Sequence, residues 1–155
     1  MTKAPIVAPA QAKDAEAIIW LFEEMDRFYG SETIGSMDLR MAQVEAALFG
    51  PAPVAAALLA WEEDTLAGIA SYSRHWPAVG LTQSVYLKEL YVADASRGRG
   101  VGRALMAALF EVASTLGCSR VEWTTDTGNL AAQRFYEELG AKPRTSKIFY
   151  RSEFQ

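Results

Sequence analysis

The spacing of the apolar residues changes twice between residues 85 and 125, and this change limits the possible folds more than any other feature. Residues 85–92 are rich in Val, Leu and Tyr, which is typical of a strand. Between residues 101 and 116 the apolar residues recur at helical spacing, Gly117 ends that helix, and residues 120–125 indicate a short strand. A strand, a loop, a helix and a strand in this order predict a crossover connection between parallel strands.

The rest of the chain predicts antiparallel strands and amphipathic helices. The charged turn at residues 62–64 joins two apolar runs, which form a predicted meander together with residues 85–92. On the first helix we expect Glu23, Glu24 and Arg27 to face water. The further elements are strands over 6–8, 54–61, 66–76 and 147–151, and helices over 13–28, 38–48 and 129–139. The predicted fold class is therefore α/β, with a mixed, mostly antiparallel central sheet flanked by helices, in a single domain over residues 1–155.

The composition argues against several classes of protein. Half of the 155 residues are hydrophobic and 22% are charged, as in an ordinary globular domain. The net charge of −4 lacks the basic surplus of a nucleic-acid-binding protein, so we expect no nucleic-acid partner. Cys118 is the one cysteine, which excludes an internal disulfide and a thiolate metal cluster, and we expect no metal. No signal peptide and no apolar run long enough to span a membrane is recognised, so we expect a cytoplasmic protein with no membrane partner.

The most specific motif is the run Arg97-Gly98-Arg99-Gly100-Val101-Gly102 between the strand and the long helix. Glycines allow positive φ and a close approach of the backbone to a ligand, and the amides of a helix N-terminus favour an anion such as a diphosphate. A Rossmann fingerprint would need glycine where Arg103 stands, and the Gly-Lys-Ser/Thr of a Walker loop is absent. The spacing therefore excludes both nucleotide-binding motifs. The run fits either the site of another anionic cofactor or a glycine-rich turn with no ligand.

This run resembles the acyl-CoA signature of the GNAT superfamily of N-acetyltransferases, Arg/Gln-x-x-Gly-x-Gly/Ala between a strand and a helix. The preceding segment, residues 89–92, is similar to the central strand of that family. A second family segment is matched by Asn129, Ala132, Phe135, Tyr136 and Gly140, in the family's order and spacing. The resemblance implies the GNAT fold over almost the whole chain and acetyl-CoA as co-substrate.

Within the superfamily, residues 76–92 resemble the branch of spermidine/spermine and thialysine acetyltransferases. That branch carries two adjacent acids in the central strand, whereas here the first of these positions holds Lys88, before Glu89. The reversed charge argues against a dicationic polyamine as the acceptor.

The resemblance also implies roles for individual residues. Glu89 is the candidate base and Tyr136 the candidate acid for the thiolate; the alternatives are a solvent-facing strand residue and a packed helix aromatic. Backbone N–H groups around residues 90–92 would stabilise the oxyanion. The implied cofactor-binding residues are Leu90, Tyr91, Val92, Arg97, Gly98, Arg99, Gly100, Val101, Gly102, Arg103 and Asn129.

The acceptor side is less defined by the sequence. Tyr72, Trp76 and Tyr86 fit either an aromatic wall for a cation or an ordinary core. His75 is the one histidine and fits either a substrate contact, a base or an incidental loop residue. The candidate substrate-binding residues are Tyr29, Glu32, Tyr72, His75, Trp76 and Tyr86, with Asp26 beside the first two.

The expected function is that of an acyltransferase that moves an acetyl group from acetyl-CoA to a primary amine of a small molecule, by direct attack of the amine on the thioester. An alkyl amine has a pKa near 10.4, so about one molecule in 10³ is neutral near pH 7, and a base is needed. The alternatives are an acetyltransferase for protein lysines or N-termini, or a CoA-binding module without catalysis. The resemblance also allows a homodimer.

Overall fold

The computed structural model describes residues 3–32 and 35–154, and in these residues five strands form one sheet in the order β1–β2–β3–β4–β5. The strands are β1 (Ile6–Pro9), β2 (Ala56–Glu62), β3 (Thr65–His75), β4 (Ser84–Val92) and β5 (Arg120–Glu122). Neighbours from β1 to β4 pair antiparallel, and β5 pairs parallel with β4. The predicted mixed, mostly antiparallel sheet with one crossover is confirmed.

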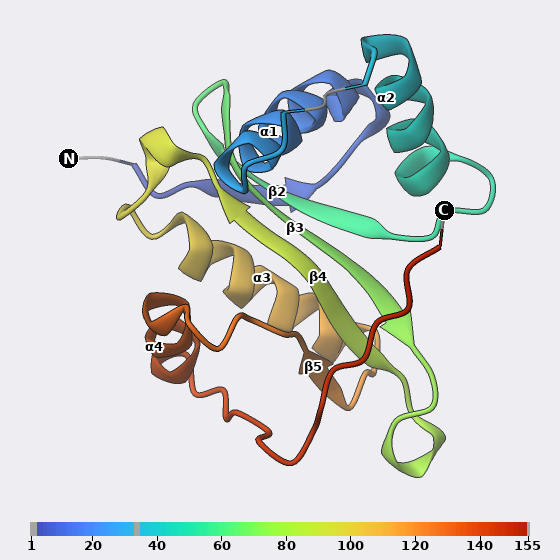
Figure 1. Ribbon diagram of the computed structural model, residues 1–155, viewed down its shortest axis with the longest axis vertical. Helices are drawn as coiled ribbons and strands as arrows, with labels where there is room; N and C mark the ends of the chain where they lie inside the picture. Colours follow the sequence, from blue (N-terminus) through green and yellow to red (C-terminus); the bar gives the residue numbers. More distant parts are fainter. Residues whose placement is uncertain (1–2, 33–34, 155) are drawn as a thin grey trace. The chain divides into compact units, whose positions relative to one another are not determined.

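The helices that flank the sheet in Figure 1 are α1 (Ala15–Phe28), α2 (Met37–Val44) and α3 (Val101–Thr115). A further helix, α4 (Leu130–Glu138), follows β5 in the chain. Single helical turns lie at η1 (Ala12–Asp14), η3 (Val79–Leu81) and η4 (Asp94–Ser96), and α2 continues as a wider π-helical turn, η2 (Glu45–Phe49). The chain divides into two compact units, Met1–Trp123 with the sheet and Thr124–Gln155 with α4.

The two faces of the sheet pack on different helices. On one face α1 contributes Ile18 and Leu21 to a core cluster with Leu59, Ile69 and Tyr91. On the other face α3 buries a ridge of apolar residues, Val101, Leu105, Met106 and Leu109, none more than 1% exposed. The two faces are separated by the alternation of side chains along β3.

Gly68 sets how closely α3 approaches the sheet. A Cβ at this position would lie 2.9 Å from Val101 Cγ1 and 3.0 Å from Leu105 Cδ1, closer than real Cβ contacts. Any other residue in this place would therefore push the start of α3, and with it the glycine loop, away from β3.

Several expectations from the sequence are wrong. No strand forms over 147–151: this segment pairs with none of the strands in the described residues, and a strand needs such a partner. β5 ends at Glu122 rather than at residue 125, and the second helix ends as a π-helical turn. Glu23 is 5% exposed and does not face water, since its carboxylate lies 3.9 Å from Arg40 Nε of α2.

Candidate functional site

The glycine loop, residues 97–102, leads from η4 into the N-terminus of α3. Gly98 and Gly100 have φ of 77° and 82°, and Gly100 is the N-cap of the helix. Nothing lies within 4 Å of the place where a Cβ would stand at either glycine. Ala104 donates the first backbone hydrogen bond of the helix, to Gly100 O at 3.0 Å, and the amides of Val101 and Gly102 belong to the turn that finds no acceptor within a helix. The loop therefore presents glycine backbone and helix-end amides, the groups that bind a phosphate-type anion.

The first two arginines of the loop are engaged within the protein. Arg97 Nε donates to Val92 O at 3.2 Å, and its guanidinium lies 4.6 Å from the centre of the Phe28 ring. Arg99 Nη2 donates to Glu62 Oε1 at 2.7 Å. These two side chains are thus engaged within the protein and hold the loop in place. Arg103 lies exposed in the first turn of α3.

Lys88 forms a β-bulge in the central strand, β4. Ser71 of β3 pairs with Glu89, and the next residue, Tyr72, pairs with Leu87, so Lys88 is the extra residue on β4. The bulge changes the side-chain alternation and places Glu89 on the same face as Ile69 and Tyr91, toward α1. The face of Glu89 could not be derived from sequence alternation for this reason.

Glu89 is half-buried beside other charges. Burial raises the pKa of Glu89 above its ordinary 4.5, the Lys88 ammonium lowers this pKa, and the Asp26 carboxylate on α1 raises it further. Asp26 itself accepts a hydrogen bond from Arg40 Nη2 at 3.1 Å. A carboxylate with a raised pKa is better suited to accept a proton from an ammonium group than an exposed carboxylate is.

Beyond the bulge, β4 has an open edge. Among the described residues, β5 pairs with β4 over Ser84–Tyr86 and no further. Ala93 N donates to Ala67 O at 2.8 Å, and bonded pairs alternate with non-bonded pairs along an antiparallel ladder. The amides of Leu90 and Val92 therefore point away from β3, toward the open edge, whereas the amide of Tyr91 points to β3. Of the three backbone groups expected to stabilise an oxyanion, the amides of two point toward the open edge of β4.

The aromatic residues near the acceptor side do not form the wall considered from the sequence. Tyr86 pairs with Ser73 and shares its face with His75, and their rings stack at 4.9 Å with an angle of 3° between the planes. Tyr72 faces the opposite side of the sheet, because it is adjacent to Ser73 on β3. Trp76 is 64% exposed, and its indole donates to Leu81 O in its own loop at 3.0 Å.

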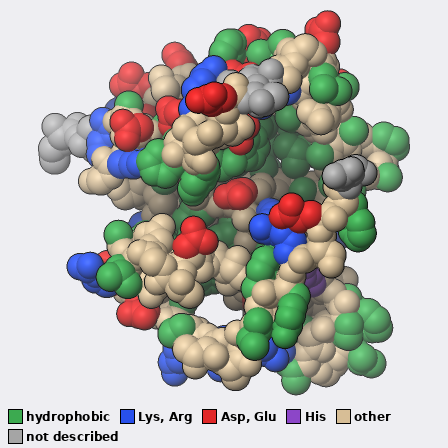
Figure 2. All heavy atoms as spheres, viewed as in Figure 1, with side chains coloured by type: hydrophobic (Ala, Val, Ile, Leu, Met, Phe, Trp, Pro, Cys, Tyr) green, Lys and Arg blue, Asp and Glu red, His purple; other side chains and the backbone are tan. Residues whose placement is uncertain are grey.

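The α1-facing side of the sheet thus brings together Glu89, Tyr86 and His75, with Asp26 on the helix above. Tyr29 ends α1 and is exposed, and Glu32 is exposed just before residues 33–34, which lie outside the described residues. Acidic side chains gather over the upper part of the view in Figure 2, where Figure 1 places α1 and α2. Such a surface suits a cationic acceptor more than an anionic one.

Sequence reasoning expected Glu24 to face water, but this residue is half-buried; it also did not name Phe28 or Arg40 as residues of the site. Glu24 accepts hydrogen bonds from Tyr91 Oη at 2.5 Å and from Asp94 N at 3.1 Å. These partners lie about 70 positions further along the chain, so no local pattern indicates them. The one available signal was that the first helix is acidic around its C-terminal half.

The unit Thr124–Gln155 carries the second motif. Asn129 caps α4, because its Oδ1 accepts from Ala132 N at 3.1 Å. Tyr136 lies on α4, half-buried, with its ring 5.2 Å from that of Phe135. The Asn129 side chain is thus used in the cap, and the predicted helix and its cap are confirmed.

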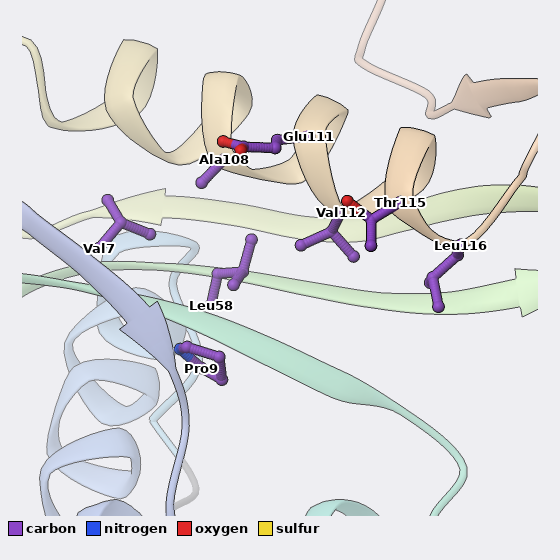
Figure 3. Close-up of a pocket in the computed structure, with 8 residues that line it drawn as sticks. All are labelled: Val7, Pro9, Leu58, Ala108, Glu111, Val112, Thr115 and Leu116. Atoms are coloured by element: carbon purple, nitrogen blue, oxygen red, sulfur yellow. The ribbon is translucent and has the colours of Figure 1, made fainter.

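A hollow of about 310 Å³ lies elsewhere, between α3 and strands β1 and β2. Figure 3 shows that Val7, Pro9 and Leu58 line it from the strands, and Ala108, Glu111, Val112, Thr115 and Leu116 from the C-terminal half of α3. Its lining is mainly apolar and lies at the end of α3 opposite to the glycine loop. It offers no acid–base pair for the chemistry expected here.

Within the described residues, no group of three His, Cys, Asp or Glu side chains could hold a metal ion. None of the described helices combines the length and the apolar character needed to cross a bilayer.

Comparison with known proteins gives the family. The model of the Acetyltransferase (GNAT) family matches residues 16–141. The chain belongs to the GNAT family. A D-amino-acid N-acetyltransferase of Saccharomyces cerevisiae is 32% identical over 149 residues, which cover 94% of this chain and 89% of the yeast protein. An L-ornithine N5-acetyltransferase of Arabidopsis thaliana is 31% identical over 77 residues, so the match spans half of this chain and about a third of that relative.

Solved structures share the fold. An integron cassette protein from the mobile metagenome of V. cholerae superposes with a TM-score of 0.85 at 27% identity, covering 98% of this chain and 94% of the other. An aminoglycoside N-acetyltransferase in complex with CoA gives a TM-score of 0.76 at 21% identity, covering 99% of both chains. The chain is therefore an acyltransferase with the GNAT fold.

The residues of this GNAT chain fit CoA at the glycine loop. The two glycines with positive φ leave open the space that a side chain would fill, and the start of α3 offers amides to an anion. The loop can thus hold a diphosphate through its backbone, with Arg103 as the nearby exposed cation.

Proposed function

We propose that the chain is an acetyl-CoA-dependent N-acetyltransferase whose acceptor is a primary amine of a small molecule. The observation that carries the proposal is the half-buried Glu89 on the face toward α1, on the strand that leads into the glycine loop. The relatives act, by their names, on D-amino acids, ornithine, thialysine and aminoglycosides, which all carry amines.

Glu89 would serve as the base. The amine binds as an ammonium, and Glu89 takes the proton that the nitrogen must lose before it attacks. Since the pKa of Glu89 is raised, the free-energy cost of this transfer is smaller than for an exposed carboxylate. Lys88, exposed on the bulge, disfavours a second ammonium group beside the first, so we expect an acceptor with one cationic group at this position.

Backbone amides and a tyrosine would complete the reaction. Acetyl-CoA supplies the acetyl thioester when bound. The amine nitrogen bonds to the acetyl carbon, the carbon–sulfur bond breaks, and the amides of Leu90 and Val92 stabilise the negative charge on the acetyl oxygen. We propose that Tyr136 gives its proton to the leaving thiolate and regains one from the nitrogen, which loses its second proton as the amide forms. This role is supported by the sequence motif around Tyr136 alone.

The acceptor class can be tested by measuring free thiol after purified protein is mixed with acetyl-CoA and a panel of amines. The panel contains D- and L-amino acids, ornithine, an aminoglycoside and a lysine-containing peptide. Thiol release with a small amine supports the proposal. Thiol release with the peptide alone would indicate that the chain is a protein acetyltransferase. CoA binding without thiol release would indicate a CoA-binding module without catalysis.

Tyr136→Phe tests the proposed acid. We expect a lower kcat with little change in the KM for either substrate, because the phenol would act only in the transition state. The free energy of unfolding in urea serves as the control for packing. A wild-type kcat in this variant would show that Tyr136 packs in α4 and is not the acid.

A homodimer and a cytoplasmic location stay predictions from the sequence.

A further inference from the structure

The first arginine of the glycine loop is held by residues outside the loop. Arg97 lies between two aromatic rings, 4.6 Å from the centre of Phe28 and 5.5 Å from that of Tyr91, and donates to Val92 O. Its contact with Asp94, at 3.6 Å, is exposed and weak. Phe28 lies in the last turn of α1, and its side chain is 58% exposed, so burial in the core does not explain it.

A second link joins α1 to the same segment. Glu24 accepts from the phenol of Tyr91 at 2.5 Å and from the backbone N–H of Asp94 at 3.1 Å. Asp94 begins the helical turn η4, which leads directly into the loop. Burial, chiefly, and the hydrogen bond to Glu24 raise the pKa of Tyr91 to about 12, so the phenol stays a donor at any physiological pH. Helix α1 is therefore bonded to the backbone just before Arg97.

The contact of Arg99 with Glu62 restrains the loop at one point, but the glycines themselves do not fix its shape. Gly98 and Gly100 both adopt positive φ, and no atom stands within 4 Å of their missing Cβ positions. Because glycine visits many backbone conformations with similar ease, the conformation that presents the amides has to be stabilised from outside. If that conformation is populated only in part, the affinity for the anion falls by the same fraction.

We propose that Phe28 and Glu24 of α1 are positioning residues for the glycine loop, which hold Arg97 and the backbone before it in the conformation that binds the diphosphate of CoA. The proposal rests on the proposed use of acetyl-CoA. It gives α1 a role on the cofactor side as well as on the acceptor side. Phe28 is the more informative position, because an exposed ring can be changed with little effect on the core.

The test is the affinity for CoA, measured by calorimetry without any amine, in variants at Phe28. Phe28→Leu keeps an apolar side chain but removes the ring face; we expect Kd for CoA to rise about two- to five-fold, the size that an exposed cation–π contact contributes. Phe28→Tyr keeps the ring and should restore the wild-type Kd. Trp20→Leu is the matched control, since Trp20 is an aromatic residue of the same helix, 55% exposed, whose indole donates to Glu16.

The outcomes separate this proposal from the proposed function. If the wild type binds CoA and Phe28→Leu binds it equally well, or if Phe28→Tyr fails to restore the affinity, the positioning role is wrong while the function stands. If Trp20→Leu weakens binding as much as Phe28→Leu, the effect is a general one on α1, and the proposal is also wrong. If the wild type binds no CoA, both proposals fail. Faster hydrogen exchange of the amides of residues 94–100 in Phe28→Leu alone would support the role independently.

Discussion

The charges that surround Glu89 decide what this residue can do. Burial and Asp26 raise the pKa of Glu89, and Lys88 lowers it. Because the folded state then holds the proton more tightly than the unfolded state, the carboxyl group stabilises the fold at low pH. That stability is lost as the pH rises through the raised pKa. At neutral pH the ionised Glu89 thus destabilises the fold, which is common for residues kept for catalysis.

Glu89→Gln should therefore lower activity while it raises stability. At pH 7 we expect kcat/KM to fall by about 10²-fold or more, the usual contribution of a general base. The remaining rate should rise about tenfold per pH unit below the pKa of the amine, because only amine already neutral in solution reacts. Urea unfolding at pH 7 should show a higher free energy of unfolding. If the pH–rate profile of the variant runs parallel to that of the wild type, Glu89 is not the base.

The raised pKa of Tyr91 predicts that the protein loses stability at high pH. Its phenol has a pKa raised from 10.0 to about 12, so its contribution to stability is fully present below pH 10 and is lost as the pH rises toward 12. Urea unfolding between pH 9 and pH 12 should show this decrease in the wild type. Tyr91→Phe, which is less stable at pH 7 by about 1–2 kcal/mol, should lack it. The same decrease in both proteins would contradict the assignment.

At the scale of elements, the glycine loop and the start of α3 act together. Gly100→Ala should lower the free energy of unfolding by about 1 kcal/mol, because alanine disfavours φ of 82°. It should also raise the KM for acetyl-CoA several-fold, because a methyl group would enter the space left to the ligand. Gly117→Ala is the matched control, with φ of 72° and no atom within 4 Å of its Cβ position. We expect the same loss of stability from it and no change in KM; equal KM values in both variants would contradict a ligand at Gly100.

The packing of α3 on β3 allows a separate prediction. Gly68→Ala places a methyl group about 3 Å from Val101, Leu105 and the carbonyl of Tyr91. Such overpacking costs about 1–3 kcal/mol, measured as the free energy of unfolding in urea. Because the start of α3 must shift, we expect weaker CoA binding as well. A variant as stable as the wild type would show that α3 adjusts without strain.

At the scale of the whole chain, local patterns predicted more of the fold than of the site. The strand, glycine loop and helix over residues 85–116 were predictable, because each has its own period and turn chemistry. The strand expected over 147–151 was wrong, because a strand depends on a partner that a local pattern cannot supply. The face of Glu89 depends on the bulge at Lys88, and the contacts of Glu24 and Phe28 join segments about 70 residues apart. These long-range features are what position the candidate site.

The proposed reaction is the transfer of an acetyl group from acetyl-CoA to an amine nitrogen. The most direct measurement is the mass balance of a reaction with the best amine of the panel, followed by mass spectrometry over time. N-acetylated amine and free CoA should appear in equal amounts, and the formation of both should depend on Glu89. Release of CoA without acetylated amine, or no turnover of acetyl-CoA with any amine, would contradict it.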